Sequence, residues 1–482
     1  MMNYRPLSFI TGLVLSKIAF FMYFPMILAF YTNTLGGFEF FFSIVLTHFT
    51  SALLVYFGRE KKRSHLGVRE MFLLTTGVWV LASLFAALPF VFIEHISYSD
   101  AFFETMSGIT TTGSTVLHGL DTMHPSILLW RSILQWLGGV GFIVMGVAIL
   151  PFLNVGGMRL FQTESSDWSD KAESKTRRVA LDILLVYIAL TCCCYIGYRL
   201  AGMHHFDAIN HAMTTISTGG YSTSDGSMGH FSNMAHWNAI IFMFLGGLPF
   251  LLLIRAVNKK SLKPLWQDAQ IIGFSKLVLC GALSLSFYLT MTDQFNWLDA
   301  IRLSLFNVVS VVTTTGFGLD DFLTWGDFSI VVFFGLLFTG ACSGSTAGGI
   351  KIFRFQIAFA LLKRQLMLLM HPHALFPQKY NNRNVSDEIL RSLIAFVMAY
   401  FGTIIVATLL LSLFGAPAMT ALTASITAVS NVGPGLVQDI GPSGNFAAFP
   451  NASKWVLSIC MLMGRLEILT VAVMLTRHFW RR

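Results

Sequence analysis

The nine residues Ser310-Val311-Val312-Thr313-Thr314-Thr315-Gly316-Phe317-Gly318 run from an apolar segment through three threonines to a glycine. The same outline occurs three more times, at intervals of roughly a hundred residues, in Thr110-Thr111-Thr112-Gly113-Ser114, Ser217-Thr218-Gly219-Gly220-Tyr221 and Ser430-Asn431-Val432-Gly433-Pro434-Gly435. A repeat of this length is a complete structural unit and not one turn of a solenoid. The sequence therefore predicts four related units.

The composition predicts that these units lie in a membrane. Of the 482 residues, 55% are hydrophobic and only 12% are charged, which a water-soluble globule cannot accommodate. We expect an all-α integral membrane protein with ten transmembrane helices, because ten apolar segments approach or exceed the ~18 to 20 residues that cross a bilayer. The segments are 6–33, 36–57, 71–94, 126–150, 179–201, 234–256, 269–291, 328–350, 388–414 and 454–476.

Four further apolar segments are too short or too polar to cross, and each lies directly before one of the glycine stretches. They are 98–112, 205–218, 297–315 and 416–432, and we interpret them as re-entrant half-helices. Asp100, Asp207 and Asp299 open the first three segments, where an aspartate can cap a helix start. Irregular backbone at membrane depth must be buried in protein or line a water-filled cavity, so this arrangement indicates a pore or a transport site.

Charge sets the orientation of the chain. Basic residues gather in the loops 59–69, 159–178, 255–263 and 351–383 and at the C-terminus, which places these loops and both termini in the cytoplasm. The opposite side, which holds the four glycine stretches, carries mostly acids, among them Glu104 and Asp225. An acidic outer mouth concentrates cations. The net charge of +8 therefore does not argue for a nucleic-acid partner, and most single basic residues only set the topology.

The residue types in the glycine stretches suit a cation filter. Such a filter needs closely spaced backbone carbonyls aimed at one axis, and glycine permits the backbone angles that aim them. One Thr-Thr-Gly stretch is an ordinary loop, but four copies on the acidic side, each after a half-helix, predict a ring.

Three motifs resemble a known family: Ser107-Gly108-Ile109-Thr110-Thr111-Thr112-Gly113, the stretch 310–318, and Ser343-Gly344-Ser345-Thr346-Ala347-Gly348-Gly349-Ile350-Lys351. They resemble the Trk/Ktr/HKT superfamily of potassium transporters, and within it most closely bacterial TrkH and TrkG. The resemblance covers essentially the whole chain. It implies a multi-pass protein of the bacterial inner membrane whose four potassium-channel-like units, 67–160, 161–262, 263–372 and 373–482, follow two N-terminal helices in 1–66.

The resemblance also implies the residues of the filter. Its glycines would be Gly113, Gly219, Gly316 and Gly433, flanked by Thr111, Thr112, Thr218, Thr314, Thr315, Asn431 and Val432. In the plant branch of the superfamily, serine in place of the first glycine accompanies sodium preference. The glycine at position 113 therefore favours K+ as the transported ion, with Rb+ also accepted.

The segment 328–350 ends in a run of small residues that will not form a stable helix. A loop of such residues at mid-membrane must face a cavity, and the resemblance implies a gate loop below the filter. Its residues would be Gly340, Ser343, Gly344, Ser345, Thr346, Ala347, Gly348 and Gly349. The alternative is close helix packing through small residues.

Arg465 and Glu467 lie well inside the last apolar segment, where a charge is costly and usually functional. Because they are two residues apart, they point to different helix faces and we do not expect them to pair. The resemblance implies that Arg465 lies in the pore below the filter as an electrostatic barrier. The alternative is a salt bridge that holds helices together.

Several functions lack a sequence signal. The six cysteines show no metal or disulfide spacing, and no phosphate-binding or dinucleotide motif appears, so we expect neither an enzyme nor an organic cofactor. Nucleotide control would come from a partner, and the resemblance implies a cytosolic TrkA-like nucleotide-binding protein docked on a homodimer in the lipid bilayer. One alternative function is a K+ symporter coupled to H+ or Na+ by alternating access, whose signature is inverted repeats and membrane-buried carboxylates.

Overall fold

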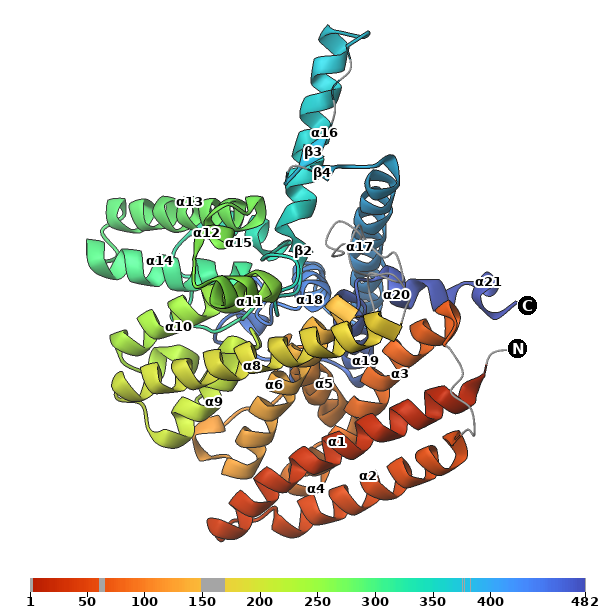
Figure 1. Ribbon diagram of the computed structural model, residues 1–482. Helices are drawn as coiled ribbons and strands as arrows, with labels where there is room; N and C mark the ends of the chain where they lie inside the picture. Colours follow the sequence, from red (N-terminus) through yellow and green to blue (C-terminus); the bar gives the residue numbers. More distant parts are fainter. Residues whose placement is uncertain are drawn as a thin grey trace.

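The structure is a computed structural model, and it describes residues 3–59, 66–148, 170–374, 376, 378–381 and 383–481. The described chain is mostly helical, with two short two-stranded sheets. Figure 1 shows the helices gathered around a common centre, with α16 (Ile352–Met370) projecting from one side of the molecule.

The first two helices form an antiparallel pair at the edge of the molecule, drawn red in Figure 1. They are α1 (Tyr4–Tyr31) and α2 (Gly37–Gly58). Glycine lets the two backbones approach closely, because a side chain on Gly58 would collide with the backbone of Phe9. The Ser51 hydroxyl donates to the Gly12 carbonyl oxygen at 2.7 Å and fastens the pair. Helix α1 packs on α3 (Val68–Ala86) and α6 (Pro125–Ala148), and α2 packs on α4 (Leu88–Glu94).

Four units follow, each with an outer helix, a short pore helix and an inner helix. The outer helices are α3 with its continuation α4 (Leu88–Glu94), α8 (Asp170–Leu200), α13 (Ala269–Met291) and α17 (Asp387–Leu413). The pore helices are α5 (Tyr98–Ile109), α9 (His205–Ile216), α14 (Trp297–Val312) and α18 (Ala418–Ser430). The inner helices are α6, α10 (Asn233–Gly246) with α11 (Phe250–Lys259), α15 (Asp327–Leu337), and α19 (Asn451–Arg465) with α20 (Leu469–Ala472).

The remaining elements are short connections. They are α12 (Lys263–Trp266), α21 (Arg477–Trp480), the parallel pair β1 (Thr339–Gly340) and β2 (Ile350–Lys351), and the antiparallel pair β3 (Lys379–Tyr380) and β4 (Arg383–Asn384).

Three of the ten predicted spans are sharply bent or end early. In the described residues, seven helices are long and apolar enough to cross a membrane, or nine if each bent pair counts as one span. The span 234–256 bends by 96° between α10 and α11, where Pro249 cannot continue the preceding helix. The span 454–476 bends by 111° after Arg465. The span 328–350 stops being helical at Leu337, where the small-residue run begins.

The four predicted half-helices correspond to α5, α9, α14 and α18. The expectation that aspartates cap the first three is wrong, because each aspartate lies inside the first turn. The residues at the cap positions are Ser97, His204 and Asn296. An acid in the first turn still stabilises the helix through its dipole. Asp100 also forms an ion pair with Lys454 of α19 at 2.5 Å, which joins unit 1 to unit 4.

Candidate functional site

Each pore helix ends in the same tight turn. In each turn a backbone N–H donates to the carbonyl oxygen five residues earlier, in the pore helix, at 2.8 to 3.1 Å. The four bonds run from Thr112 to Ser107, from Gly219 to Thr214, from Thr315 to Ser310 and from Val432 to Thr427. The residue before each donor has a left-handed backbone, with φ of 54°, 52°, 56° and 56° at Thr111, Thr218, Thr314 and Asn431. This geometry closes a helix C-terminus and turns the chain sharply. The four strands that follow therefore start alike.

The strands close into a ring. In each strand a glycine with positive φ lies so close to the next strand that an added Cβ would strike a carbonyl oxygen there. The distance from the added Cβ to the carbonyl oxygen is 2.4 Å for Gly113 and Gly219, 1.9 Å for Gly220 and Thr315, 2.1 Å for Gly316 and Val432, and 2.8 Å for Gly433 and Thr112. Strand 1 thus contacts strand 2, strand 2 contacts strand 3, strand 3 contacts strand 4, and strand 4 returns to strand 1.

The second strand is offset by one residue from the sequence interpretation. Gly220, with φ of 77°, occupies the position that Gly113, Gly316 and Gly433 occupy in the other strands. Gly219 instead corresponds to Thr112, because both make the same backbone hydrogen bond to their pore helix. The sequence could not choose between two adjacent glycines, whereas the contact with the Thr315 carbonyl distinguishes them.

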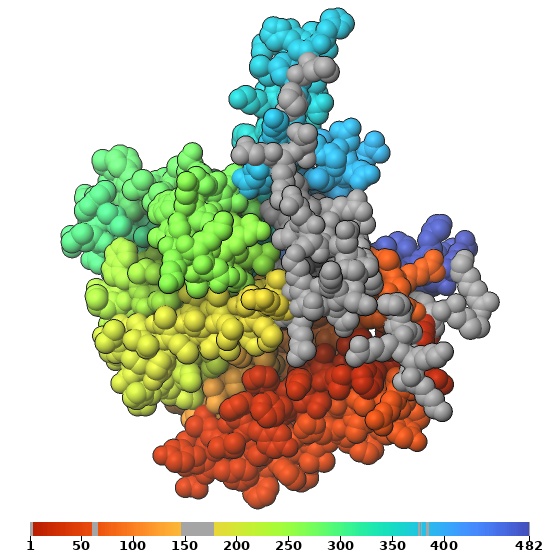
Figure 2. Space-filling view, viewed as in Figure 1, coloured from red at the N-terminus to blue at the C-terminus, as the bar shows by residue number. Residues whose placement is uncertain are grey.

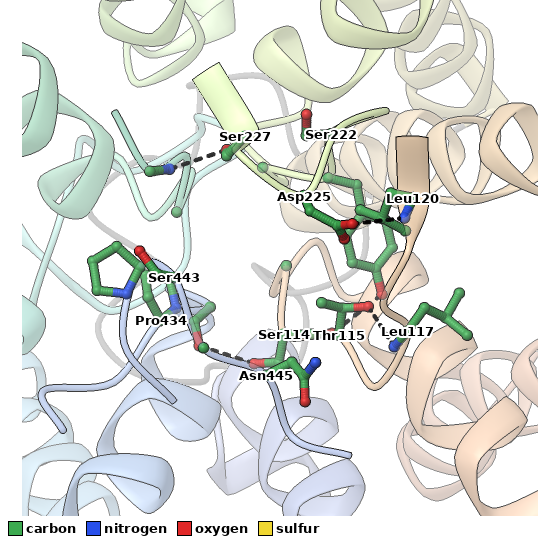
Figure 3. A pocket seen from close by; sticks show the side chains of 18 of the residues that line it. Ser114, Thr115, Leu117, Leu120, Ser222, Asp225, Ser227, Pro434, Ser443 and Asn445 are labelled. Carbon is green, nitrogen blue, oxygen red and sulfur yellow. Dashed lines mark hydrogen bonds between the residues drawn. The ribbon is translucent and has the colours of Figure 1, made fainter. Parts of the chain in front are cut away.

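Outside the ring lies a cavity of about 250 Å³, shown in Figure 3, which all four of these glycines line. The Ser114 hydroxyl donates across it to the Gly433 carbonyl oxygen at 3.0 Å. Its lining is mostly hydroxyl groups and backbone, and Asp225 is its one lining acid among the described residues. The Asp225 carboxylate accepts from the Leu120 N–H at 3.1 Å, so it also links the loops of units 1 and 2.

A buried ion pair braces the outer ends of strands 1 and 2. Glu104 is completely buried, although the sequence places it among the acids of the outer mouth, and its carboxylate lies 2.9 Å from the Arg131 guanidinium. The Glu104 carboxylate also accepts from the Val116 N–H, and Arg131 donates to the Ser222 carbonyl. The Arg131 guanidinium lies 4.1 Å from the Tyr221 ring centre. Sequence analysis did not single out Arg131, although a charge inside a predicted span is the usual signal of such a pair.

The small-residue loop lies directly beneath the ring. The Gly348 N–H donates to the Thr314 hydroxyl at 2.7 Å, and the Thr218 hydroxyl donates to the Thr346 hydroxyl at 3.1 Å. A Cβ on Gly348 would lie 2.9 Å from that of Asn431. The loop therefore contacts strands 2, 3 and 4, and Ser345, Thr346 and Ala347 are completely buried.

Short contacts hold the loop in this place. Strands β1 and β2 pair at its two ends, and Gly340 has no room for a side chain against the Gly348 carbonyl. The Ser343 N–H donates to the Gln270 side chain of α13 at 2.8 Å, and the Gly344 carbonyl accepts from the Phe250 N–H at 3.0 Å. The loop is thus attached to the bend between α10 and α11.

Arg465 reaches the same loop from the end of α19. Its side chain is completely buried and donates to the Thr346 carbonyl oxygen at 2.7 Å and to the Gly138 carbonyl oxygen at 3.4 Å. The guanidinium lies 4.1 Å from the centre of the Phe142 ring. Arg465 therefore fastens the loop to α6 and α19.

Glu467 points elsewhere, as its spacing predicts. Its carboxylate lies 2.5 Å from the Arg354 guanidinium of α16, and both side chains are buried. The chain leaves the helix between these two charged residues, with φ of 61° at Glu467. This change of backbone direction lets Arg465 bind the small-residue loop and Glu467 pair with Arg354.

Four repeated units around one axis, with a ring of backbone carbonyls outside and a loop closing it inside, define a membrane protein for cation permeation. The chain belongs to the TrkH family: the model of this family of cation transport proteins matches residues 36–480.

Named relatives match most or all of the chain. The Trk system potassium uptake protein TrkI of Halomonas elongata is 49% identical over 418 residues, which cover 86% of this chain and 84% of that protein. The Trk system potassium uptake protein TrkH of Escherichia coli is 35% identical over the whole of both chains. The crystal structure of the potassium transporter TrkH from Vibrio parahaemolyticus aligns over the whole of both chains with a TM-score of 0.92 and 32% identity.

Proposed function

We propose that this chain is the ion-conducting membrane subunit of a potassium uptake system, which lets K+ and Rb+ pass selectively through the glycine ring. The observation that carries the proposal is the closed ring of four strands, each held at the end of its own pore helix. The relatives that match most or all of the chain are potassium uptake proteins by name, which supports the choice of cargo.

The ring supplies what a dehydrating cation needs. Backbone carbonyls replace the hydration shell, and the negative ends of the four pore helices point toward the ion's path. The Thr111 hydroxyl is buried and has no hydrogen-bond partner in the described residues, so an oxygen ligand is available beside the ring. The residues that would coordinate the ion are Thr111, Thr112, Gly113, Thr218, Gly219, Gly220, Thr314, Thr315, Gly316, Asn431, Val432 and Gly433.

The loop and Arg465 form the gate in this proposal. The loop fills the space below the ring and hydrogen-bonds to Thr314 and Thr218, so an ion leaving the ring would meet it. Opening requires the loop to move away and to break the bond from Arg465 to Thr346. The positive charge of Arg465 adds an electrostatic barrier to a cation.

The buried carboxylates are held in ion pairs, which favours a pore over a proton-coupled carrier. A carrier of that kind needs acids in the membrane that can exchange protons or bind the coupling ion. Glu104 and Glu467 are buried, but each is held in an ion pair, with Arg131 and Arg354. The Glu104 carboxylate also accepts from the Val116 N–H, and neither acid lines the cavity outside the ring, so neither is placed to bind a coupling ion there.

The test is Rb+ uptake into K+-loaded liposomes that carry the purified chain, with Na+ as competitor and with the membrane potential and the proton gradient clamped in turn. Uptake that follows the Rb+ gradient and the potential supports the pore. Uptake that requires an imposed H+ or Na+ gradient identifies a coupled symporter and overturns the proposal.

We also propose that the chain lies in the bacterial inner membrane with both termini in the cytoplasm. The Asn3 N–H donates to the Glu70 carboxylate at 2.8 Å, and the Arg69 guanidinium donates to the Arg481 carbonyl at 2.7 Å. These bonds hold the two ends of the chain beside the start of α3, and Figure 1 shows the ends close together. The basic loops support the cytoplasmic assignment of this side.

The partners we propose are a second copy of the chain and a cytosolic nucleotide-binding regulatory subunit of the TrkA type. Figure 2 shows α16 standing out from the rest of the molecule. Apolar side chains on this helix are exposed, among them Phe359, Leu366 and Leu369. Exposed apolar side chains clustered on one helix are typical of an interaction surface. Basic residues near α16 could bind the regulatory subunit or lipid headgroups.

A further inference from the structure

The first and third strands of the ring are braced by their own side chains. The Thr112 hydroxyl lies 2.8 Å from the Thr110 hydroxyl, and the Thr315 hydroxyl lies 2.7 Å from the Thr313 hydroxyl. Thr110 and Thr313 in turn each donate to a carbonyl oxygen of their own pore helix at 2.6 Å. Each of these strands is therefore tied to the helix that precedes it.

The second strand lacks this brace, because Gly219 stands where Thr112 and Thr315 stand in the first and third strands; in the fourth strand this position is Val432. A side chain from another unit fills the gap. Gln135 of α6 is completely buried, and the position of a Cβ on Gly219 lies only 2.4 Å from the Gln135 amide carbon. The missing threonine of strand 2 and the buried glutamine of unit 1 thus occupy the same space.

Both ends of the Gln135 amide bind strand 2. Its Nε2 donates to the Gly219 carbonyl oxygen at 2.5 Å, and its Oε1 accepts from the Tyr221 N–H at 3.0 Å. The two bonds lie on either side of Gly220, the ring glycine of this strand. The Gly219 carbonyl is also the group that abuts Gly113 of strand 1. Gln135 therefore holds a carbonyl that forms part of the ring contact between units 1 and 2.

We infer that Gln135 is a positioning residue for cation selectivity, which holds strand 2 in place of a threonine that the strand lacks. The inference rests on the proposed function of the ring as a filter. A filter discriminates between ions through the number and direction of its carbonyls. A carbonyl whose direction is set by a buried hydrogen bond has less freedom to adapt to a smaller ion. Loss of the Gln135 amide should therefore admit Na+ more easily and leave the protein folded.

The first test replaces Gln135 by methionine, which keeps the length of the side chain and removes both hydrogen bonds. Rb+ and Na+ uptake are measured separately in the same liposomes. We expect the ratio of Rb+ to Na+ uptake to fall about two- to tenfold, the range that the loss of a net hydrogen bond represents. The matched control is Gln294→Met, because the Gln294 side-chain amide also donates to a backbone carbonyl, that of Trp325, but Gln294 is exposed and lies outside the ring. Its ratio should stay unchanged.

The second test moves the brace from α6 to the strand. Gly219→Thr alone should lower the ratio, because the new side chain collides with Gln135. In the double variant Gly219→Thr with Gln135→Ala, the threonine has room and can bond Ser217, which stands where Thr110 stands in strand 1 and donates to its own pore helix at 3.2 Å. The double variant should recover most of the ratio that either single variant loses.

The outcomes separate this inference from the proposed function. If the unaltered chain shows no selective permeation, the filter itself is wrong. Suppose instead that the unaltered chain is selective. If Gln135→Met then keeps the same ratio of Rb+ to Na+ uptake, or if Gln294→Met lowers that ratio as much as Gln135→Met does, Gln135 has no positioning role. If Gln135→Met does not fold, the double variant carries the test, and a folded double variant without recovered selectivity overturns the inference.

Discussion

Alanine at the four ring glycines should impair selectivity in an order that the ring contacts set. A methyl group on Gly220 would lie 1.9 Å from the Thr315 carbonyl oxygen, whereas one on Gly433 would lie 2.8 Å from that of Thr112. Contacts of Cβ atoms below 3.0 Å essentially do not occur. To reach 3.0 Å, the Thr315 carbonyl oxygen must move away by about 1.1 Å, whereas the Thr112 carbonyl oxygen must move by about 0.2 Å.

The energies follow from two separate effects. A non-glycine residue with positive φ costs about 1 to 2 kcal/mol at any of the four positions. Overpacking adds about 1 to 3 kcal/mol where a neighbour must move, which applies most strongly to Gly220. We therefore expect a cost of about 2 to 5 kcal/mol for Gly220→Ala and closer to 1 to 2 kcal/mol for Gly433→Ala. A displaced carbonyl also changes the distance to the ion.

The assay is the ratio of Rb+ to Na+ uptake in liposomes, together with thermal unfolding in detergent. The loss of selectivity should rank from largest to smallest as Gly220, Gly316, Gly113 and Gly433, following the contact distances. The matched control is Gly415→Ala, because Gly415 also has positive φ, 95°, but has nothing within 4 Å of its Cβ position. This variant should lose stability through its backbone alone and keep its ratio.

Two results would refute the reasoning. If Gly415→Ala loses as much selectivity as Gly220→Ala, backbone strain and not contact across the ring explains the effect. If Gly219→Ala is worse than Gly220→Ala, the assignment of Gly220 to the ring is wrong. Gly219 has no positive φ, and the three atoms nearest to its added methyl all belong to the end of the Gln135 side chain, whereas that of Gly220 meets backbone.

Three further predictions concern the gate, the brace and the dimer. Arg465→Ala removes the charged hydrogen bond to the gate loop, about 1.5 to 3 kcal/mol, and should raise Rb+ flux about tenfold or more. Arg131→Met leaves the Glu104 carboxylate buried without its charge partner and should lower the unfolding free energy by about 3 to 5 kcal/mol, measured by thermal unfolding. Leu366→Glu on the exposed face of α16 should shift the detergent-solubilised protein toward the monomer, measured by light scattering.

Each of these predictions has a control and a contradicting result. The control for Arg465→Ala is Arg199→Ala, which removes a part-buried arginine that donates to the Met203 carbonyl and should leave Rb+ flux unchanged. If Arg465→Ala also leaves the flux at the level of the unaltered chain, Arg465 is not part of the gate. Replacing both members of the ion pair, Glu104→Leu with Arg131→Met, should cost less than the single change, and an additive cost would argue against coupling. The control for Leu366→Glu is Lys363→Gln, which changes an exposed polar residue of α16. If Lys363→Gln shifts the protein toward the monomer as much as Leu366→Glu does, the apolar side chains of α16 do not form the dimer contact.

The sequence by itself determined the architecture, because hydropathy and repetition are local properties. The four half-helices correspond to α5, α9, α14 and α18, and the run of small residues after Leu337 is the loop that the low helix propensity of its residues predicts. Arg465 and Glu467 have separate partners, as their spacing indicates. Each of these conclusions depends on residues that are close together in the chain.

The tertiary structure alone decided which distant groups meet. Local pattern could not choose between Gly219 and Gly220, because the features that distinguish them exist only in the folded chain. They are the positive φ of Gly220 and its contact with the carbonyl of Thr315, almost a hundred residues away. Nor could it show that Gln135 supplies the brace that strand 2 lacks, since that bond joins two units. Buried polar groups must find partners wherever the fold brings them, and in a ring of four strands those partners come from different repeats.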